Sequence, residues 1–139
     1  MKNNLLIVCF ASLSLVACAQ KNTKKSSTPE AVKQAFATAH PDVKNARWEK
    51  EDANYEVGFT VDKKEQSILY NAEGTVLETE VEISMTELPI VIQELIVKDY
   101  PKGRIKETAK ITDAKGNVSY EVEMNGTDLL FDNAGNKIH

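Results

Sequence analysis

The feature that most constrains this chain is a set of short segments that occur twice, in the same order, in its two halves. Three pairs correspond: Tyr55-Glu56-Val57 with Tyr120-Glu121-Val122, Leu69 to Gly74 with Leu130 to Gly135, and His40-Pro41 with Tyr100-Pro101. One such match can arise by chance, but three in a common order indicate duplication of one supersecondary unit. The sequence therefore predicts two tandem units.

Each unit begins with a predicted short helix. In the first unit, Thr28-Pro29-Glu30 supplies an N-cap residue, a proline at the first helical position and an acid in the first turn. Apolar residues follow at helical spacing until Pro41 ends the helix. In the second unit, Ser84-Met85-Thr86-Glu87 has the pattern of a capping box, and the helix is predicted from Leu88 to the residues before Tyr100.

Strands are predicted after each helix, because apolar and polar residues alternate there and turn residues separate the runs. The predicted strands of the first unit are Ala46 to Glu51, Tyr55 to Val61, Ser67 to Tyr70 and Thr75 to Ser84. Those of the second unit are Arg104 to Thr112, Val118 to Met124, Asp128 to Phe131 and a stub at Asn136 to His139. The predicted fold is α+β: two tandem helix-plus-four-strand antiparallel meander units, residues 28–84 and 85–139, with the helices packed on antiparallel sheet.

Several of these segments together resemble one known family. They are the helix ending in His or Tyr before Pro, the Trp48-Glu49-Lys50 segment, the Tyr-Glu-Val segments, and Tyr70-Asn71 or Phe131-Asp132 with glycine three places further on. This pattern resembles the PepSY-like, β-lactamase-inhibitor-like family over residues 29–139. The resemblance implies an exported protein of Bacteroidetes-type bacteria that acts as a protein- or peptide-interaction module, inhibiting or chaperoning an envelope peptidase.

The N-terminus predicts export. Lys2 precedes an apolar run, so residues 1–17 are predicted to be a signal peptide. Leu15-Val16-Ala17-Cys18 resembles the lipobox of bacterial lipoproteins, in which Cys18 carries the lipid that anchors the protein to the membrane. The alternative is cleavage after residue 19, which releases a soluble periplasmic protein. Residues 18–27 are polar, with three lysines and no acid, and are predicted to be a disordered tether.

Charge and residue inventory narrow the function. Residues 28–84 hold 12 acidic and 6 basic side chains, whereas nucleic-acid phosphates require clustered Lys and Arg. After residue 18 the chain has no cysteine, and its two histidines, His40 and His139, lie at the ends of elements. The side chains that nucleophilic catalysis or a zinc site would require are therefore missing. We predict that the protein is not an enzyme and has no catalytic residue, no metal and no cofactor.

The candidate binding residues are Glu78, Glu80 and Glu82, which share one face of a predicted strand at a spacing of about 6.6 to 6.8 Å. Two interpretations remain open at this point. The face could bind a basic peptide or a divalent cation. It could instead be a solvated face neutralised by lysines on neighbouring strands, among them Lys63, Lys64, Lys106 and Lys110.

Two packing hypotheses follow from the second unit. In the hairpin closed by Asp113 to Asn117, the residues Lys106, Lys110, Glu121 and Glu123 are predicted to share one exposed face, with Lys110 opposite Glu121. The second helix carries Ile90 and Val97 beside its main apolar stripe, so it is predicted to bury two faces, the second against the first helix.

These observations predict a non-enzymatic envelope protein that works by binding. The expected partner is an envelope protein or peptide. The expected location is the periplasm, with attachment to the membrane through the lipid anchor. The alternative function is a periplasmic small-ligand or cation binder that uses the acidic strand face.

Overall fold

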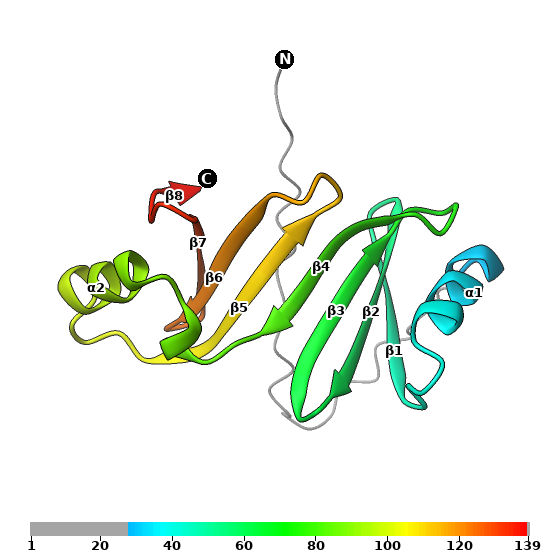
Figure 1. Cartoon of the computed structure of the whole chain (residues 1–139), viewed down its shortest axis with the longest axis horizontal. Helices are drawn as coiled ribbons and strands as arrows, with labels where there is room; N and C mark the ends of the chain where they lie inside the picture. The colour runs from blue at the N-terminus through cyan, green and yellow to red at the C-terminus, as the bar shows by residue number, and fades with distance from the viewer. Residues whose placement is uncertain (1–27, 139) are drawn as a thin grey trace, which may run out of the picture.

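The computed structural model describes residues 28–138 of the chain, which form an α+β fold with one antiparallel sheet (Figure 1). The sheet has eight strands whose spatial order is their order in the sequence, so it is a single meander. The first four strands are β1 (Ala46–Glu51), β2 (Asn54–Val61), β3 (Lys64–Tyr70) and β4 (Val76–Glu82). The last four are β5 (Ile105–Asp113), β6 (Val118–Met124), β7 (Thr127–Asp132) and β8 (Lys137–Ile138). Every predicted strand is present, with ends shifted by a few residues.

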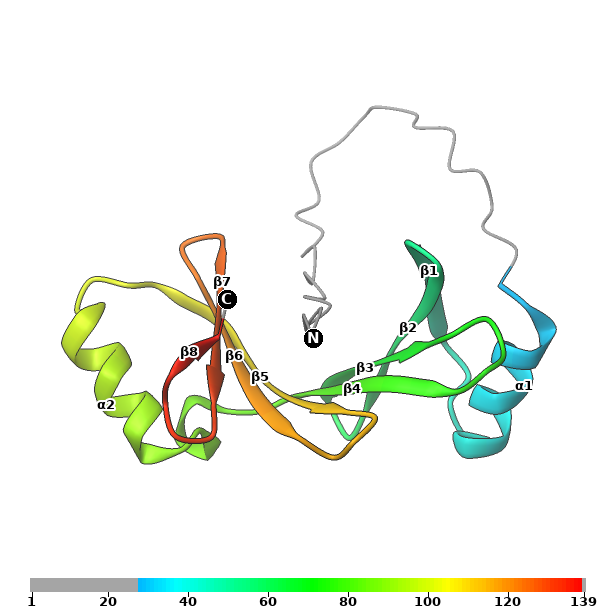
Figure 2. The same cartoon turned by 90° about the horizontal axis from the view of Figure 1, so that it is seen from above.

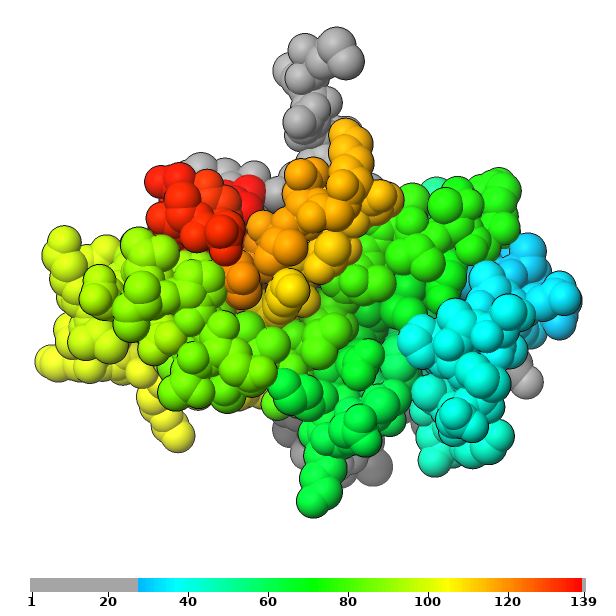
Figure 3. Space-filling model, viewed as in Figure 1, coloured from blue at the N-terminus to red at the C-terminus, as the bar shows by residue number. Residues whose placement is uncertain are grey.

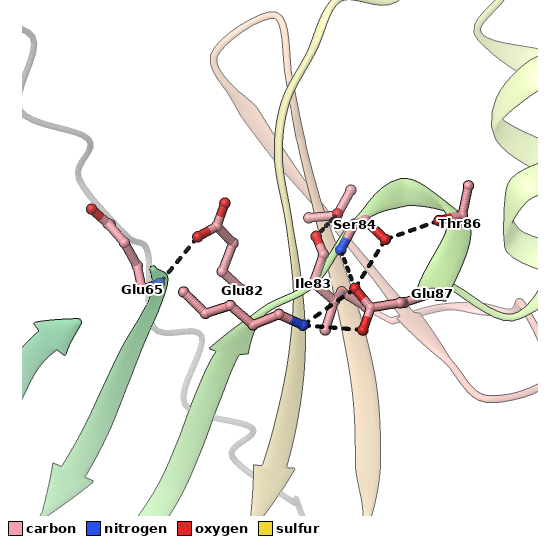
Figure 4. Close-up of polar contacts among 8 residues, drawn as sticks. Glu65, Glu82, Ile83, Ser84, Thr86 and Glu87 are labelled. Carbon is pink, nitrogen blue, oxygen red and sulfur yellow. Dashed lines mark hydrogen bonds and ion pairs between the residues drawn. The ribbon is translucent and has the colours of Figure 1, made fainter. Parts of the chain in front are cut away.

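The helices α1 (Glu30–Ala39) and α2 (Ile90–Asp99) begin later than the sequence suggested. Pro29 occupies the N-cap position, with extended backbone, in place of the first helical position predicted for it. Pro89 is the N-cap residue of α2 in the same conformation. The predicted capping box is present: Glu87 Oε2 accepts hydrogen bonds from Ser84 N at 2.7 Å and Ser84 Oγ at 2.9 Å (Figure 4). It closes the separate 3-10 turn η1 (Met85–Glu87), so Leu88 precedes α2.

Three hairpins are closed by the same five-residue turn. In each, the first residue is Asn71, Asp113 or Asp132, and its Oδ1 accepts hydrogen bonds from the N–H groups two and four residues further on. The N–H three residues on belongs to a glycine with positive φ and donates to the carbonyl of the first residue. This is a type I turn followed by a left-handed glycine, the usual three-residue hairpin loop.

Two apolar clusters lie on one face of the sheet. The first joins α1 to β2 and β3 through Val32, Phe36, Val57, Phe59, Ile68 and Tyr70. The second joins α2 and the preceding Leu88 to β6 and β7, and its residues are Leu88, Ile92, Ile96, Val122, Met124, Leu129 and Phe131. The cross-strand register runs from Val57 through Ile68, Thr79 and Thr112 to Val118, so both clusters and both helices belong to the same face.

The two helices lie at opposite ends of the sheet, with strands of the sheet between them (Figures 1 and 3). The prediction that α2 buries a second face against α1 is therefore wrong. Ile90 is 67% exposed and Val97 is 69% exposed. Each helix covers the apolar surface of its own nearby strands, so one stripe per helix is buried.

The predicted register of the β5–β6 hairpin is also wrong. Lys110 is paired with Tyr120, and Glu121 with Ala109. The loop between Asp113 and Asn117 has three residues, so near the loop the residue numbers of each directly paired couple add up to an even number, as 110 and 120 do. The prediction paired 110 with 121, whose sum is odd, and was therefore out of register by one residue. Lys110 therefore lies on the helix face and Glu121 on the opposite face. Lys106 Nζ does lie 2.9 Å from Glu123 Oε2, but Glu123 is buried, at 6% exposure, so the predicted exposed face is wrong for this residue too.

The predicted signal peptide (1–17), tether (18–27) and lipidation site Cys18 lie outside the described residues, as does His139. Within residues 28–138, no helix has the length and apolar character needed to cross a membrane.

Candidate functional site

The sheet face opposite the helices is strongly acidic. Because side chains alternate along a strand, every strand that turns its apolar residues toward a helix turns the residues between them to the other side. We call this side the acidic face. Carboxylates reach it from β1 to β7, and they include Glu49, Glu51, Glu56, Glu65, Glu78, Glu80, Glu82, Glu107, Asp113, Glu121, Glu123 and Asp128.

The three residues proposed from the sequence, Glu78, Glu80 and Glu82, belong to β4, which is one of the two middle strands of the sheet (Figure 1). In the cross-strand register, Glu78 lies between Leu69 and Asp113, and Glu80 lies between Ser67 and Ile111. Glu82 lies opposite Ala109 and accepts a hydrogen bond at 3.0 Å from the backbone N–H of Glu65 (Figure 4). Their predicted alignment on one face of a strand is confirmed.

The structure adds carboxylates that the sequence analysis did not assign to this site. Glu121 and Glu123 of β6 were predicted on an exposed, lysine-paired face, and Glu56 of β2 was not singled out. The signal was present in the repeated Tyr-Glu-Val segments. In each, the flanking Tyr and Val face a helix, so the central Glu must face the other side.

Lysines do not neutralise the centre of the acidic face. Of the four proposed neutralising lysines, Lys64 pairs with Glu87 Oε1 at 3.1 Å, and Lys106 pairs with Glu123. Lys110 lies on the helix face, and Lys63 lies in the β2–β3 turn. Within residues 28–138 no ion pair reaches the three β4 glutamates, so the neutralised interpretation fails at the centre.

Two carboxylates at the centre of the acidic face are buried, and each has one oxygen without a hydrogen-bond partner among the described residues. Glu80 is 5% exposed and Glu121 is 4% exposed. The Oε2 atom of each has no hydrogen-bond partner among residues 28–138. A buried carboxylate oxygen without a partner is costly to the fold, because it has lost water and gained nothing in return.

Burial and crowding with like charges raise the pKa values of these groups. Desolvation comes first and neighbouring carboxylates second: the pKa of Glu80 rises to about 9, with Glu121 as its strongest charged neighbour. The pKa of Glu121 rises to about 8 and that of Glu78 to about 7 for the same two reasons. Near neutral pH the centre of the face is therefore largely protonated, and it would gain negative charge if a cation were placed against it.

Apolar side chains are interleaved with the carboxylates. Leu69 lies opposite Glu78, Ile111 opposite Glu80, and Leu130 opposite Glu121. All three apolar side chains are buried, yet they belong to neither helix-facing cluster. Each of the three central carboxylates therefore has a buried apolar side chain as its cross-strand neighbour.

Other candidate chemistry is weaker. Within residues 28–138 no group of three Asp, Glu, His or Cys side chains is placed to hold a metal ion. The ring of His40 stacks on Phe36 at 5.0 Å and lies 4.9 Å from Phe59, so it is part of the first core. The ring of Trp48 meets that of Phe36 edge-on, with 5.4 Å between their centres, so Trp48 packs against the first core.

An eight-stranded antiparallel meander with two helices on one face and acids on the other defines a small α+β protein with one helix-free sheet face. The family described as "Putative beta-lactamase-inhibitor-like, PepSY-like" matches residues 14–78 and again residues 54–139. The chain belongs to this PepSY-like family, which confirms the resemblance read from the sequence.

Solved structures from Bacteroides share the fold. A "putative periplasmic" protein from Bacteroides eggerthii has a TM-score of 0.73 at 12% identity, covering 81% of this chain and 86% of its own. A DUF2874 family protein from Bacteroides uniformis has a TM-score of 0.70 at 16% identity, covering 80% and 86%. A BLIP-like protein from Bacteroides fragilis has a TM-score of 0.62 at 20% identity, covering 80% and 84%. The curated proteins contain no match.

Proposed function

We propose that this chain is a non-enzymatic protein of the bacterial cell envelope that binds a basic, extended segment of another polypeptide on its acidic face. The observation that carries the proposal is the pair Glu80 and Glu121, each buried with an unpartnered carboxylate oxygen on a face that neither helix covers. A partner that supplies ammonium or guanidinium donors would satisfy these oxygens. It would also favour their charged forms, because a nearby cation lowers a carboxyl pKa.

The finer parts of the proposal rest on the family. The two sequence-related halves are copies of one unit, and the partner is an envelope protein or peptide, with an envelope peptidase as the expected class. The Bacteroides eggerthii neighbour, which is described as periplasmic, supports a location outside the cytoplasm. An eight-stranded face offers more area than a single free amino acid or ion needs, which favours a polypeptide as the occupant.

The test is a titration of the mature protein with two labelled peptides followed by fluorescence anisotropy. One is a twelve-residue peptide in which lysine alternates with leucine and threonine, and the other carries glutamate in place of each lysine. We expect binding of the basic peptide alone, and its loss in the variant Glu78→Gln/Glu80→Gln/Glu82→Gln. Calorimetric binding of Ca²⁺ without any binding of the basic peptide would overturn the proposal in favour of the cation-binder alternative.

The membrane anchor is tested separately. If Cys18 is lipidated, Cys18→Ser should move the protein from the membrane fraction to the soluble periplasmic fraction of the host cell. Wild-type protein that is already soluble, with Gln20 as its first residue by mass spectrometry, would establish the alternative cleavage.

A further inference from the structure

We infer that the acidic face recognises two lysines four positions apart in an extended segment, with an apolar residue midway between them. This inference rests on the proposed function and specifies its ligand. It follows from where the register places Glu80 and Glu121 relative to each other and to their apolar neighbours.

The two carboxylates lie on a diagonal across three strands. Glu82 and Glu121 are both paired with Ala109 of the intervening β5, so they stand in one row, and Glu80 is two residues further along β4. Two strand spacings of about 4.8 Å and a two-residue step of about 6.8 Å give a separation of roughly 12 Å between the Glu80 and Glu121 backbone positions. An extended peptide rises about 3.4 Å per residue, so residues i and i+4 stand roughly 13 Å apart on the same side.

The position between the two carboxylates is apolar. The diagonal crosses β5 between Ile111, which is paired with Glu80, and Ala109, which is paired with Glu121. Both are buried, at 6% and 1% exposure. Residue i+2 of the ligand points to the same side as i and i+4 and falls over these two side chains, so an apolar side chain is required there.

The surroundings of each carboxylate favour lysine. Ile111 beside Glu80 and Leu130 beside Glu121 surround each carboxylate with hydrocarbon that suits the long methylene stem of a lysine, while the carboxylate meets the ammonium group at its end. Both apolar side chains are buried, at 6% and 8% exposure, so the lysine stem must enter between the side chains of the face. A lysine and a glutamate extended toward each other span about the 10 Å that separates two packed sheets. The ligand backbone would therefore lie at the distance of a second layer above the sheet.

The inference is tested with short capped peptides and the mature protein in calorimetry. The matched peptide is Gly-Ser-Lys-Thr-Leu-Thr-Lys-Ser-Gly, and its control is Gly-Ser-Lys-Leu-Lys-Thr-Thr-Ser-Gly, which has the same composition with the lysines two positions apart. A third peptide replaces the leucine of the matched sequence with serine. We expect the matched peptide to bind about tenfold more tightly than either other peptide, as expected for one fully made charge-assisted hydrogen bond.

Protein variants assign the contacts. Glu80→Gln and Glu121→Gln should each weaken the matched peptide by about tenfold, since each removes one charged acceptor. Glu94→Gln, on the exposed surface of α2, makes the same charge change elsewhere and should leave the affinity unchanged. Changing either peptide lysine to norleucine should then cost much less in one of the two Gln variants than in the wild type, because that contact has already been lost.

The outcomes separate the two proposals. If the matched and shifted peptides bind equally, or if Glu94→Gln weakens binding as much as Glu80→Gln does, the lysine register is refuted while general binding of basic segments stands. If none of the basic peptides binds, including the twelve-residue peptide used above, the proposed function fails with it. Circular dichroism of each variant verifies that a loss of binding is not a loss of fold.

Discussion

Glu80 shows how a single residue can be well placed by the sequence and still be poorly understood from it. Strict alternation along β4 was enough to predict that Glu78, Glu80 and Glu82 share a face. The burial of Glu80 depends on β3 and β5, and the nearness of Glu121 depends on the β5–β6 register. Of these pairings, that of β4 with β5 joins strands distant in the sequence, and no local pattern contains it, whereas the β5–β6 register follows from the three-residue loop between the two strands.

The raised pKa values predict an unusual dependence of stability on pH. Between about pH 5 and pH 9 the folded protein keeps a proton on Glu80 that the unfolded chain has lost, so the free energy of unfolding should fall as pH rises. Glu121 and Glu78 act in the same direction, up to about pH 8 and pH 7. The lowered pKa of Glu87, about 2, has the opposite sign but changes protonation only below this range.

Urea unfolding at pH 5, 7 and 9 checks this prediction. Glu80→Gln should stabilise the protein at pH 9 by at least about 1 to 2 kcal/mol and change it little at pH 5, because each pKa unit corresponds to about 1.4 kcal/mol. Glu94→Gln serves as the control on an exposed helix and should reproduce the wild-type curve. A wild-type stability that increases from pH 5 to pH 9 would contradict the proposed environment of Glu80.

At the scale of the elements, the recurring turn explains why an aromatic residue, Asn or Asp and a glycine occur together in both halves. The aromatic residues Tyr70 and Phe131 are buried in the two cores. The glycine both takes a positive φ and lies against a helix: a Cβ on Gly74 would stand 2.8 Å from the carbonyl oxygen of Ala31 in α1. The turn thus fixes the distance between the sheet and the start of the helix.

Replacing Gly74 with alanine should therefore cost more than backbone conformation alone. Gly116 is the matched control, since its φ of +82° is nearly the same as +83° at Gly74 but a Cβ there meets nothing within 4 Å. We expect Gly116→Ala to destabilise by about 1 to 2 kcal/mol, the cost of a left-handed non-glycine residue. Gly74→Ala should lose at least about 1 kcal/mol more, because backbone must move. If chemical denaturation shows that the two variants lose equal free energies of unfolding, α1 can move away from the new methyl group at position 74 without measurable cost.

The helix pattern was more misleading than the strand pattern. Ile90 and Val97 extend the apolar stripe of α2, and the sequence contains nothing to show that α1 is held at the other end of an eight-stranded sheet. A helix alone cannot reveal which of its apolar residues will meet a partner, because that depends on the number of strands between it and the next helix. The strands could be predicted from alternation, but their joining into one sheet could not.

Substitution on α2 can verify this placement. Val97→Ala should change the free energy of unfolding by less than about 0.5 kcal/mol, because the side chain is 69% exposed. Ile96→Ala, one residue earlier and 3% exposed, should cost about 2 to 5 kcal/mol. Thermal or urea melts of the two variants give the comparison. A loss above about 2 kcal/mol at Val97 would restore the prediction that this side of the helix is packed.

At the scale of the whole molecule, the fold has two cores and one connection between them. The apolar clusters share no residue, and the helices that cover them lie apart (Figures 1 and 3). The halves meet where β4 pairs with β5, and just beyond that pairing Thr108 Oγ1 donates to the carbonyl oxygen of Ile83 at 2.6 Å. Figure 2 shows the same arrangement from above, with the sheet continuous from β1 to β8 and a helix at each end.

This arrangement predicts that a substitution that destabilises one core should lower the local stability of the other core by a smaller amount. Phe36→Ala removes a buried ring that contacts Trp48 and Phe59, and it should destabilise its own half by about 3 to 5 kcal/mol. Native-state hydrogen exchange should then show the amides of β2 and β3 losing far more protection than those of β6 and β7, because the two halves are joined mainly by the β4–β5 ladder, beside the exposed Lys64–Glu87 ion pair. Ile96→Ala is the matched change in the second core and should reverse the pattern.

The ladder is hydrogen-bonded backbone with mostly polar or half-buried side chains on the helix face, so it carries less apolar burial than either core. If both variants instead lowered protection equally in all strands, the ladder would transmit the full loss and the eight strands would unfold as one cooperative unit.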